Sequence, residues 1–175
     1  GNEASVVTPD TIKGLPSDRI DGGAIRGQNL FHSFTEFNIE LGRGATFSNP
    51  NGIENILTRV TGSNLSNIFG TLGVNGGANL FLLNPNGIIF GQNARLDVSG
   101  SFAASTANAI QFGEQGFFSA TNLQPPSQLL TINPSAFFFN QLQAGRIESS
   151  SNAPLGNNLF GLRVPDGRSL LLVGG

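Results

Sequence analysis

The 175-residue sequence contains no cysteine, methionine, tryptophan or tyrosine, and it has one histidine and one lysine. The absence of cysteine excludes disulfides, and the single histidine, His32, excludes a metal site with two histidine ligands within one chain. Charged residues make up 11% of the chain, the net charge is −2 and the arginines are scattered. Because nucleic acids and anionic membranes are bound through basic clusters, we expect no nucleic-acid partner. We also expect no metal, no cofactor and no small-molecule substrate.

Long apolar runs are missing as well. No run reaches the roughly 18 apolar residues that suggest a membrane-spanning helix, and no signal peptide is recognisable. If the protein is exported, its signal peptide is expected to have been removed before residue 1. The lack of cysteine fits a reducing cytosol, and it fits equally an exported chain that must stay unfolded in the periplasm. Composition alone therefore leaves the compartment open.

Glycine, with 24 residues, and asparagine, with 20, are abundant. Both tolerate left-handed backbone and tight turns, so many short strands joined by turns are expected. Apolar residues recur at positions i and i+2 with a step of about eight residues. The pairs are Leu72/Val74, Leu80/Leu82, Ile88/Phe90, Leu96/Val98 and Phe102/Ala104. This rhythm predicts an all-β sandwich or solenoid, and the scarcity of charge favours the solenoid, because stacked like charges would lie about 4.8 Å apart.

We predict a single domain over residues 1–175. Residues 1–45 are irregular and carry many of the charges, so they are predicted to cap the solenoid, whose coils would occupy residues 46–175. The segment Gln111–Gln128 contains Pro125 and Pro126 and is expected to leave the coil, since proline does not fit a central strand. The last residues look like a strand in mid-coil, so the chain is expected to be the N-terminal part of a longer protein.

The pentapeptide NPNGI occurs twice, at Asn49–Ile53 and at Asn84–Ile88. It contains no nucleophile, no charge and no strong metal ligand. Its residues match a type I turn position by position. Asparagine at the first position accepts a backbone hydrogen bond, proline presets φ at the second, and glycine is favoured at the fourth. Each copy is therefore predicted to form a rigid, uncharged corner.

The second copy, preceded by the segment NLFLL, resembles a signature of the two-partner secretion (TPS) domain of filamentous-haemagglutinin-like exoproteins. That family carries a first motif, usually N-P-N-L, and a second, N-P-N-G-I. Here the first motif is NPNGI itself, with Gly52 where leucine is usual. The segment Asn29–Asn38 resembles the N-terminal signature of the family, and Gly76–Thr106 is similar to cyanobacterial members. The resemblance covers most of the chain.

The resemblance implies a right-handed parallel β-helix with an N-terminal β-cap and extra-helical strands. It also implies a secretion-targeting role. Periplasmic POTRA domains of a dedicated Omp85-superfamily outer-membrane transporter would recognise the unfolded chain, which would then fold outside and nucleate the β-helix of a large adhesin-like exoprotein. The protein is expected to be secreted or held at the cell surface, to be monomeric, and not to be an enzyme.

The residues expected to matter in this role fall into two groups. The structural and secretion motifs are Asn49, Pro50, Asn51, Gly52, Asn84, Pro85, Asn86, Gly87 and Ile88. The expected N-terminal recognition segment comprises Asn29, Leu30, Phe31, Phe34, Phe37 and Asn38.

Two alternatives stay open. One is an adhesin module that itself binds a glycan or a cell. The other is a polysaccharide-cleaving enzyme, which would need clustered carboxylates. The candidate carboxylates are Asp18, Asp21, Glu36, Glu40 and Asp97, and we expect them to be solvated or capping residues. His32 lies between two phenylalanines and is expected to be packed rather than catalytic.

Overall fold

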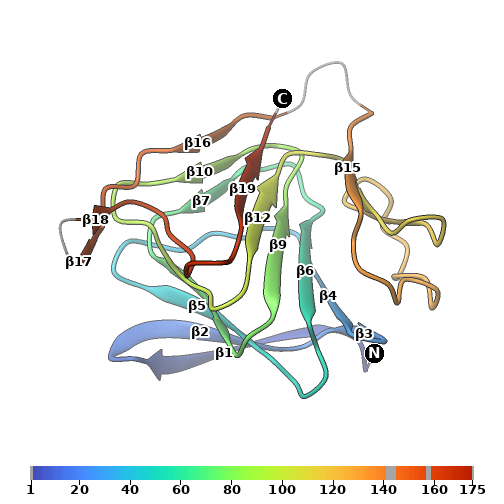
Figure 1. Cartoon of the computed structure of the whole chain (residues 1–175), viewed down its shortest axis with the longest axis horizontal. Coiled ribbons are helices and arrows are strands. Elements are labelled where there is room, and N and C mark those ends of the chain that lie inside the picture. Colours follow the sequence, from blue (N-terminus) through green and yellow to red (C-terminus); the bar gives the residue numbers. More distant parts are fainter. Residues whose placement is uncertain (1, 141–144, 157–158, 175) are drawn as a thin grey trace.

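The computed structural model describes residues 2–140, 145–156 and 159–174, and over these residues it contains strands but no helix. The chain winds as a parallel β-helix whose coils have three sides, called here sheets A, B and C (Figure 1). Sheet A consists of β1 (Ser5–Ile12), β2 (Leu15–Gly22), β5 (Gly44–Ser48), β8 (Thr71–Asn75) and β11 (Arg95–Asp97). Sheet B consists of β3 (Ala24–Arg26), β4 (Asn29–Phe34), β6 (Asn55–Val60), β9 (Asn79–Leu83), β12 (Phe102–Ser105) and β19 (Leu170–Val173). Sheet C consists of β7 (Ser66–Ile68), β10 (Ile88–Phe90) and β16 (Ile147–Ser149). The predicted β-helix is confirmed.

Successive coils stack in register. In sheet B, Leu30 lies beside Ile56, Ile56 beside Leu80, and Leu80 beside Phe102. All four side chains are almost completely buried inside the coil. The apolar pairs predicted from the i, i+2 rhythm line the same core, and among them only Leu96 is partly exposed. The alternation in the sequence therefore reports the inward face of each strand.

Antiparallel strands cover the first edge of the stack. Strands β1 and β2 form a hairpin, and β2 then pairs in parallel with β5. In sheet B, β3 is antiparallel to β4, and β4 is parallel to β6. The hairpins pair with backbone groups that would otherwise form an open edge. Parallel pairing thus starts at β2 in sheet A and at β4 in sheet B, and the antiparallel strands β1, β2 and β3 lie within residues 1–45, the part of the chain predicted to form the cap.

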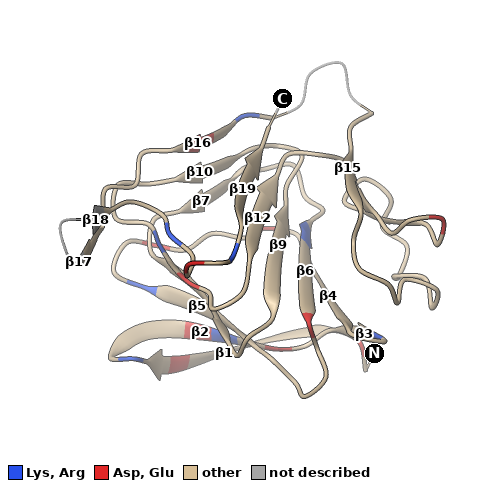
Figure 2. Cartoon of the chain, viewed as in Figure 1, with Lys and Arg blue, Asp and Glu red and all other residues tan. Residues whose placement is uncertain are grey.

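A long segment leaves the coil after β12 and returns at Gly145. Within it, β14 (Phe117–Ser119), β13 (Ala109–Gln111) and β15 (Ala136–Phe138) form an antiparallel sheet D beside sheet B (Figure 1). We call residues 106–140 the excursion; it is longer at both ends than the predicted Gln111–Gln128. No charged residue occurs between Glu114 and Arg146, and most of this part of the chain is uncharged in Figure 2. A second hairpin, β17 (Pro154–Gly156) with β18 (Leu159–Phe160), lies between β16 and β19.

The excursion covers the outer face of sheet B and creates a second hydrophobic core. Sheet B contributes Phe31, Leu57 and Leu83, and the excursion contributes Ile110, Phe112, Phe118 and Leu130. The ring of Phe31 lies 4.7 Å from that of Phe118 and 5.6 Å from that of Phe112, measured between centroids. Sheet B is therefore buried on both faces where the excursion covers it.

Candidate functional site: the two NPNGI corners

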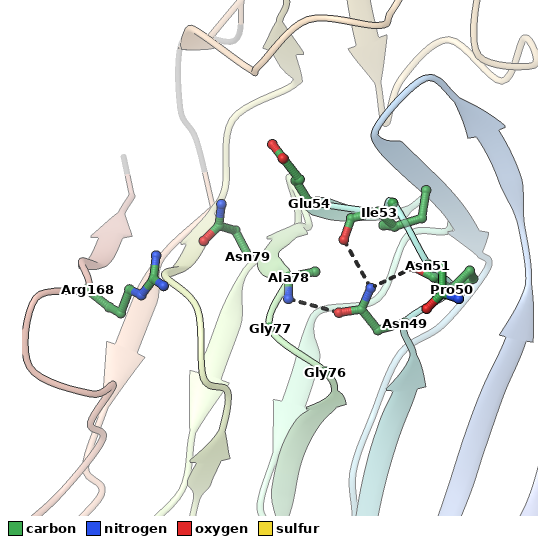
Figure 3. A pocket seen from close by; sticks show the side chains of 11 residues that line it. Asn49, Pro50, Asn51, Ile53, Glu54, Gly76, Gly77, Ala78, Asn79 and Arg168 are labelled. Atoms are coloured by element: carbon green, nitrogen blue, oxygen red, sulfur yellow. Dashed lines mark hydrogen bonds between the residues drawn. The ribbon is translucent and has the colours of Figure 1, made fainter.

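The first NPNGI copy connects β5 to β6, at the corner between sheets A and B. It lines a surface hollow of about 440 Å³ together with Gly76–Asn79 of the next coil and Arg168 (Figure 3). The amide oxygen of Asn49 accepts a hydrogen bond from the backbone nitrogen of Ala78 at 2.9 Å. The amide nitrogen of Asn49 donates to the carbonyl oxygen of Ile53 at 3.0 Å and to that of Pro50 at 3.2 Å (Figure 3). Asn49 thus fixes its own corner and joins it to the following coil.

The predicted turn is wrong by one residue in this copy. The turn closes from the nitrogen of Ile53 to the oxygen of Pro50 at 3.2 Å, so proline stands at the first position and not the second. Gly52 is then the third residue, with φ +84°, as a type II turn requires. The side-chain oxygen of Asn49 accepts from Ala78 of the next coil, whereas in the predicted turn it would accept from the backbone nitrogen two residues on. Glycine suits position 52 better than the leucine usual in the family, because a leucine would be strained at this φ.

The second copy connects β9 to β10, at the corner between sheets B and C, and adopts the predicted turn. The nitrogen of Gly87 donates to the oxygen of Asn84 at 3.2 Å, and the nitrogen of Asn86 donates to the side-chain oxygen of Asn84 at 3.0 Å. The two copies lie 35 residues apart, whereas sheet B strands repeat after 26 and 24 residues, as shown by Asn29, Asn55 and Asn79 in register. Identical pentapeptides therefore occupy different corners of the coil.

Asn84 is completely buried and links three consecutive coils. Its amide nitrogen donates to the carbonyl oxygen of Asn64 at 3.1 Å and to the hydroxyl of Ser66 at 3.0 Å, both in the preceding coil. Its backbone nitrogen donates to the oxygen of Ser105 in the following coil at 3.0 Å. The side chain of Asn86 adds a bond to the carbonyl oxygen of Gly62 at 2.7 Å. This corner carries more inter-coil hydrogen bonds than the first, where Asn51 is exposed and makes no side-chain hydrogen bond to a described residue.

The segment Asn29–Asn38 lies within the first coil. Leu30 and Phe37 belong to the inner core and Phe34 packs against it, while Phe31 faces the second core. The amide of Asn29 donates to the carbonyl oxygens of Leu130 and Ile132 in the excursion, at 2.9 and 2.7 Å. The side-chain oxygen of Asn38 accepts from the backbone nitrogen of Asn67 at 2.9 Å. The apolar side chains of this segment are therefore largely inaccessible once the domain has folded, whereas Ser33, Thr35, Glu36 and Asn38 stay exposed.

Sequence reasoning missed two features of sheet B. An asparagine ladder runs along it, in which Asn55 donates to Asn29 at 2.9 Å and Asn79 donates to Asn55 at 3.0 Å. The second feature is Arg59, which is 5% exposed and reaches into the excursion. The sequence signal for the ladder is the asparagine at the first position of β4, β6 and β9, which recurs with a spacing of one coil.

The other candidate residues do not form a catalytic cluster. His32 is buried against Phe47, with ring centroids 5.2 Å apart, and burial lowers its pKa from 6.5 to about 4. Asp97 pairs with Lys13 at 2.7 Å. Asp21 accepts bonds from Ser48 and Arg19, which lower the pKa of its carboxyl. Over the described residues there is no group of three or more histidine, cysteine, aspartate or glutamate side chains placed to hold a metal ion.

A capped parallel β-helix with uncharged Asn-Pro-Asn-Gly corners defines the class of this protein as a β-solenoid domain. A model of the TPS secretion domain matches residues 13–175, and the chain belongs to that family. TPS secretion domains direct the export of two-partner secretion exoproteins across the outer membrane to the cell surface or the medium, and the family implies a partner transporter in that membrane. In the described part of the chain, no helix has the length and apolar character to cross a membrane.

Comparison with curated proteins gives a partial match. Over 80 residues the chain is 38% identical to the heme/hemopexin-binding protein of Haemophilus influenzae. The match covers 46% of this chain and 8% of that protein, so the chain spans a small part of the relative's length. No solved structure gives a significant match.

Proposed function

We propose that the periplasmic POTRA domains of an Omp85-superfamily transporter recognise this domain while it is unfolded, and that its folding outside the cell nucleates the β-helix of a longer adhesin-like exoprotein. Asn84 is the observation that carries this proposal. Its fully buried amide bonds to the preceding coil and its backbone bonds to the following one, so at this corner an ordered coil positions the next. In a solenoid, such nearest-neighbour contacts let folding propagate from one end. Propagation outside the membrane gives translocation a direction.

The cap supports the same proposal. Its strand β2 pairs in parallel with β5 and its strand β3 pairs with β4, so the first coil folds against an ordered edge and folding has a defined starting point. The absence of cysteine removes any disulfide that would lock a loop in the periplasm before transport. We propose that the folded domain acts as a monomer at the cell surface or in the medium.

We infer that recognition of Asn29–Asn38 precedes folding. Leu30 and Phe31 are at most 2% exposed in the folded domain, so a partner can reach them only on the unfolded chain. Purified POTRA domains should bind the domain in a slowly folding variant or as a peptide of residues 29–38, and should not bind the folded domain. Equal affinity for folded and unfolded chains would contradict this order of events.

The corner residues give a matched test of the nucleation role. Asn84→Ala leaves the partners of a buried amide unsatisfied and should cost about 2 kcal/mol or more of unfolding free energy. Asn86→Ala should have a smaller effect in the same direction. The control is Asn51→Ala, at the position of the first copy equivalent to Asn86, where the side chain is exposed and makes no hydrogen bond to a described residue.

Two measurements decide the outcome. Refolding of the purified domain is followed by far-UV circular dichroism, because the chain has no tryptophan or tyrosine. Secretion of a longer exoprotein that carries each variant is measured in cells with the cognate transporter. We expect slow refolding and reduced secretion for Asn84→Ala and wild-type behaviour for Asn51→Ala. If Asn84→Ala and Asn86→Ala fold and secrete at wild-type rates, the corner has no role in nucleation.

We further propose that the domain is not an enzyme. Asp21 and Asp97, two of the candidate carboxylates, are paired with Arg19 and Lys13. Asp18 lies 3.9 Å from Arg43. Each of these carboxylates is partly exposed and lies near a separate cation, an arrangement typical of surface ion pairs that contribute at most about 1 kcal/mol each. Assays for sugar release with the wild-type domain and with Asp97→Asn should both give no product, and release by the wild type alone would overturn the assignment.

A further inference from the structure

The outer face of sheet B and the excursion form an interface between one segment of the chain and three coils that precede it in sequence. Phe31, Leu57 and Leu83 come from three successive coils, and their side chains meet the excursion as one surface. None of the three strands alone offers that surface. The excursion follows β12 in the chain, so the coils that it covers precede it in sequence.

Arg59 holds the excursion at the far end of these strands. Its guanidinium group donates to the carbonyl oxygens of Ser119 at 2.8 Å, Asn122 at 3.3 Å and Gln124 at 2.9 Å. It also donates to the hydroxyl of Ser33 on β4 at 2.7 Å. The guanidinium carbon lies 4.6 Å from the centroid of the Phe118 ring. Among the described residues, the groups that bond to this charge and the ring beneath it therefore come either from the excursion or from the neighbouring strand β4.

The charge of Arg59 has no carboxylate partner among the described residues. Burial lowers the pKa of its guanidinium, because removal from water disfavours the charged form. An arginine stays protonated in proteins, so it cannot escape this cost by losing a proton. Only the full set of carbonyl oxygens replaces the water that docking removes. A half-docked excursion would leave a desolvated charge with too few partners.

A second fastening lies at the opposite end of the same strands. There Asn29 binds the carbonyl oxygens of Leu130 and Ile132, and Asn55 donates to the side-chain oxygen of Asn133 at 2.9 Å. Asn29 and Ser33 are four residues apart, which corresponds to about 13 Å along a strand. The excursion is thus fixed at two separated points, and both depend on β4 and β6 being in register.

We propose that the excursion is a latch, closed by Arg59 and Asn29, that docks as one unit on the completed stack of β4, β6 and β9 and then holds the stack against unfolding. This inference rests on the proposed function only for its role in export, where a latched stack cannot slip back. The latch itself is a property of the purified domain. Its existence can therefore be tested without the transporter.

The test uses hydrogen–deuterium exchange by mass spectrometry and a short pulse of chymotrypsin. Trypsin is unsuitable because the excursion has no lysine or arginine between Glu114 and Arg146. In Arg59→Met, peptides that cover residues 119–126 should exchange at least tenfold faster than in the wild type, while peptides from β6 and β9 accelerate by a clearly smaller factor, because the stack loses its cover but keeps its own pairing. Arg59→Lys should recover part of the protection, because an ammonium group donates to some of the same carbonyls. The control is Arg168→Met, which removes an exposed arginine outside the latch.

The outcomes separate the latch from general stability. If residues 119–126 in Arg59→Met exchange at the wild-type rate, or if all strands accelerate by one common factor, the latch does not exist. Should Arg59→Met fail to fold, Asn133→Ala provides the same comparison at the other fastening point. If a variant with an open latch is secreted normally, the latch has a structural role in the domain but no role in export. Loss of secretion in a variant with a closed latch would bear on the proposed function instead.

Discussion

Acidification should destabilise the domain through one residue, His32. Burial against Phe47 lowers its pKa to about 4, and its Nδ1 atom is hydrogen-bonded to Ser5 of the cap at 2.9 Å. Its Nε2 atom is buried and has no hydrogen-bond partner among the described residues. A second proton on this ring would place a positive charge in an apolar core beside a strand of the cap.

The sign of the effect follows from proton binding. The unfolded chain binds a proton at His32 near pH 6.5, and the folded domain binds it only near pH 4. The stability is therefore full above pH 6.5 and is lost as the pH falls toward 4. These two pKa values give a loss of about 2 kcal/mol between pH 7.5 and pH 5, with a slope approaching 1.4 kcal/mol per pH unit. Asp21 and Glu3 have pKa values that are lowered by their partners, so their contributions are lost at still lower pH.

The assay is urea unfolding followed by far-UV circular dichroism at half-unit steps from pH 7.5 to pH 5. The matched variant is His32→Leu, since leucine already occupies the inward position two coils further along, at Leu82. The wild type should lose stability over this range, and the variant should show a nearly flat profile. Parallel profiles for the two proteins would refute the reasoning, because no other side chain has an ordinary pKa in this window.

Two further comparisons test the inward face and the close stacking of coils. Ile88→Ala should lower the free energy of unfolding by about 3 kcal/mol, because the side chain is fully buried. Ile89→Ala, on the outer face of β10, should lower it by less than about 1.5 kcal/mol. Equal losses in urea unfolding would contradict the assigned faces. Gly70→Ala would place a Cβ atom against the carbonyl oxygen of Arg43 and should destabilise by about 3 kcal/mol or more, while a Cβ atom at Gly77 meets nothing within 4 Å. A Gly70→Ala variant as stable as Gly77→Ala would show that the coils are not packed this closely.

The i, i+2 alternation identified the inward side of each strand, and the scarcity of charge favoured a solenoid over a sandwich, but the parallel β-helix itself was implied by the family resemblance. The alternation was less informative where strands are buried on both faces. In sheet B the consecutive pairs Leu30–Phe31 and Ile56–Leu57 place one side chain in each core. Consecutive apolar residues in short strands are typical of burial on two faces. Reading them that way would have predicted that something covers sheet B.

The limits of the excursion could not be read from composition for a related reason. Ala109 and Ile110 resemble a coil strand because they too belong to a buried strand, β13. Pro125 and Pro126 mark the middle of the excursion, so they indicated its presence and not its ends. The turn at Asn49–Ile53 was mispredicted because local turn preferences do not include contacts with the next coil. There the backbone nitrogen of Ala78 donates to the side-chain oxygen of Asn49.

The two NPNGI copies differ in burial after folding, and this changes which of them a partner could bind. Before folding, the two copies are chemically identical. For a partner that binds the linear pentapeptide, the unfolded chain is therefore a bivalent ligand. After folding, Pro50, Asn51 and Gly52 remain exposed, while Asn84 is sealed between coils. A bivalent contact gains its strength from simultaneous engagement and loses it when one arm is withdrawn. Folding of the second corner would therefore lower the affinity of such a partner for the chain and release the chain.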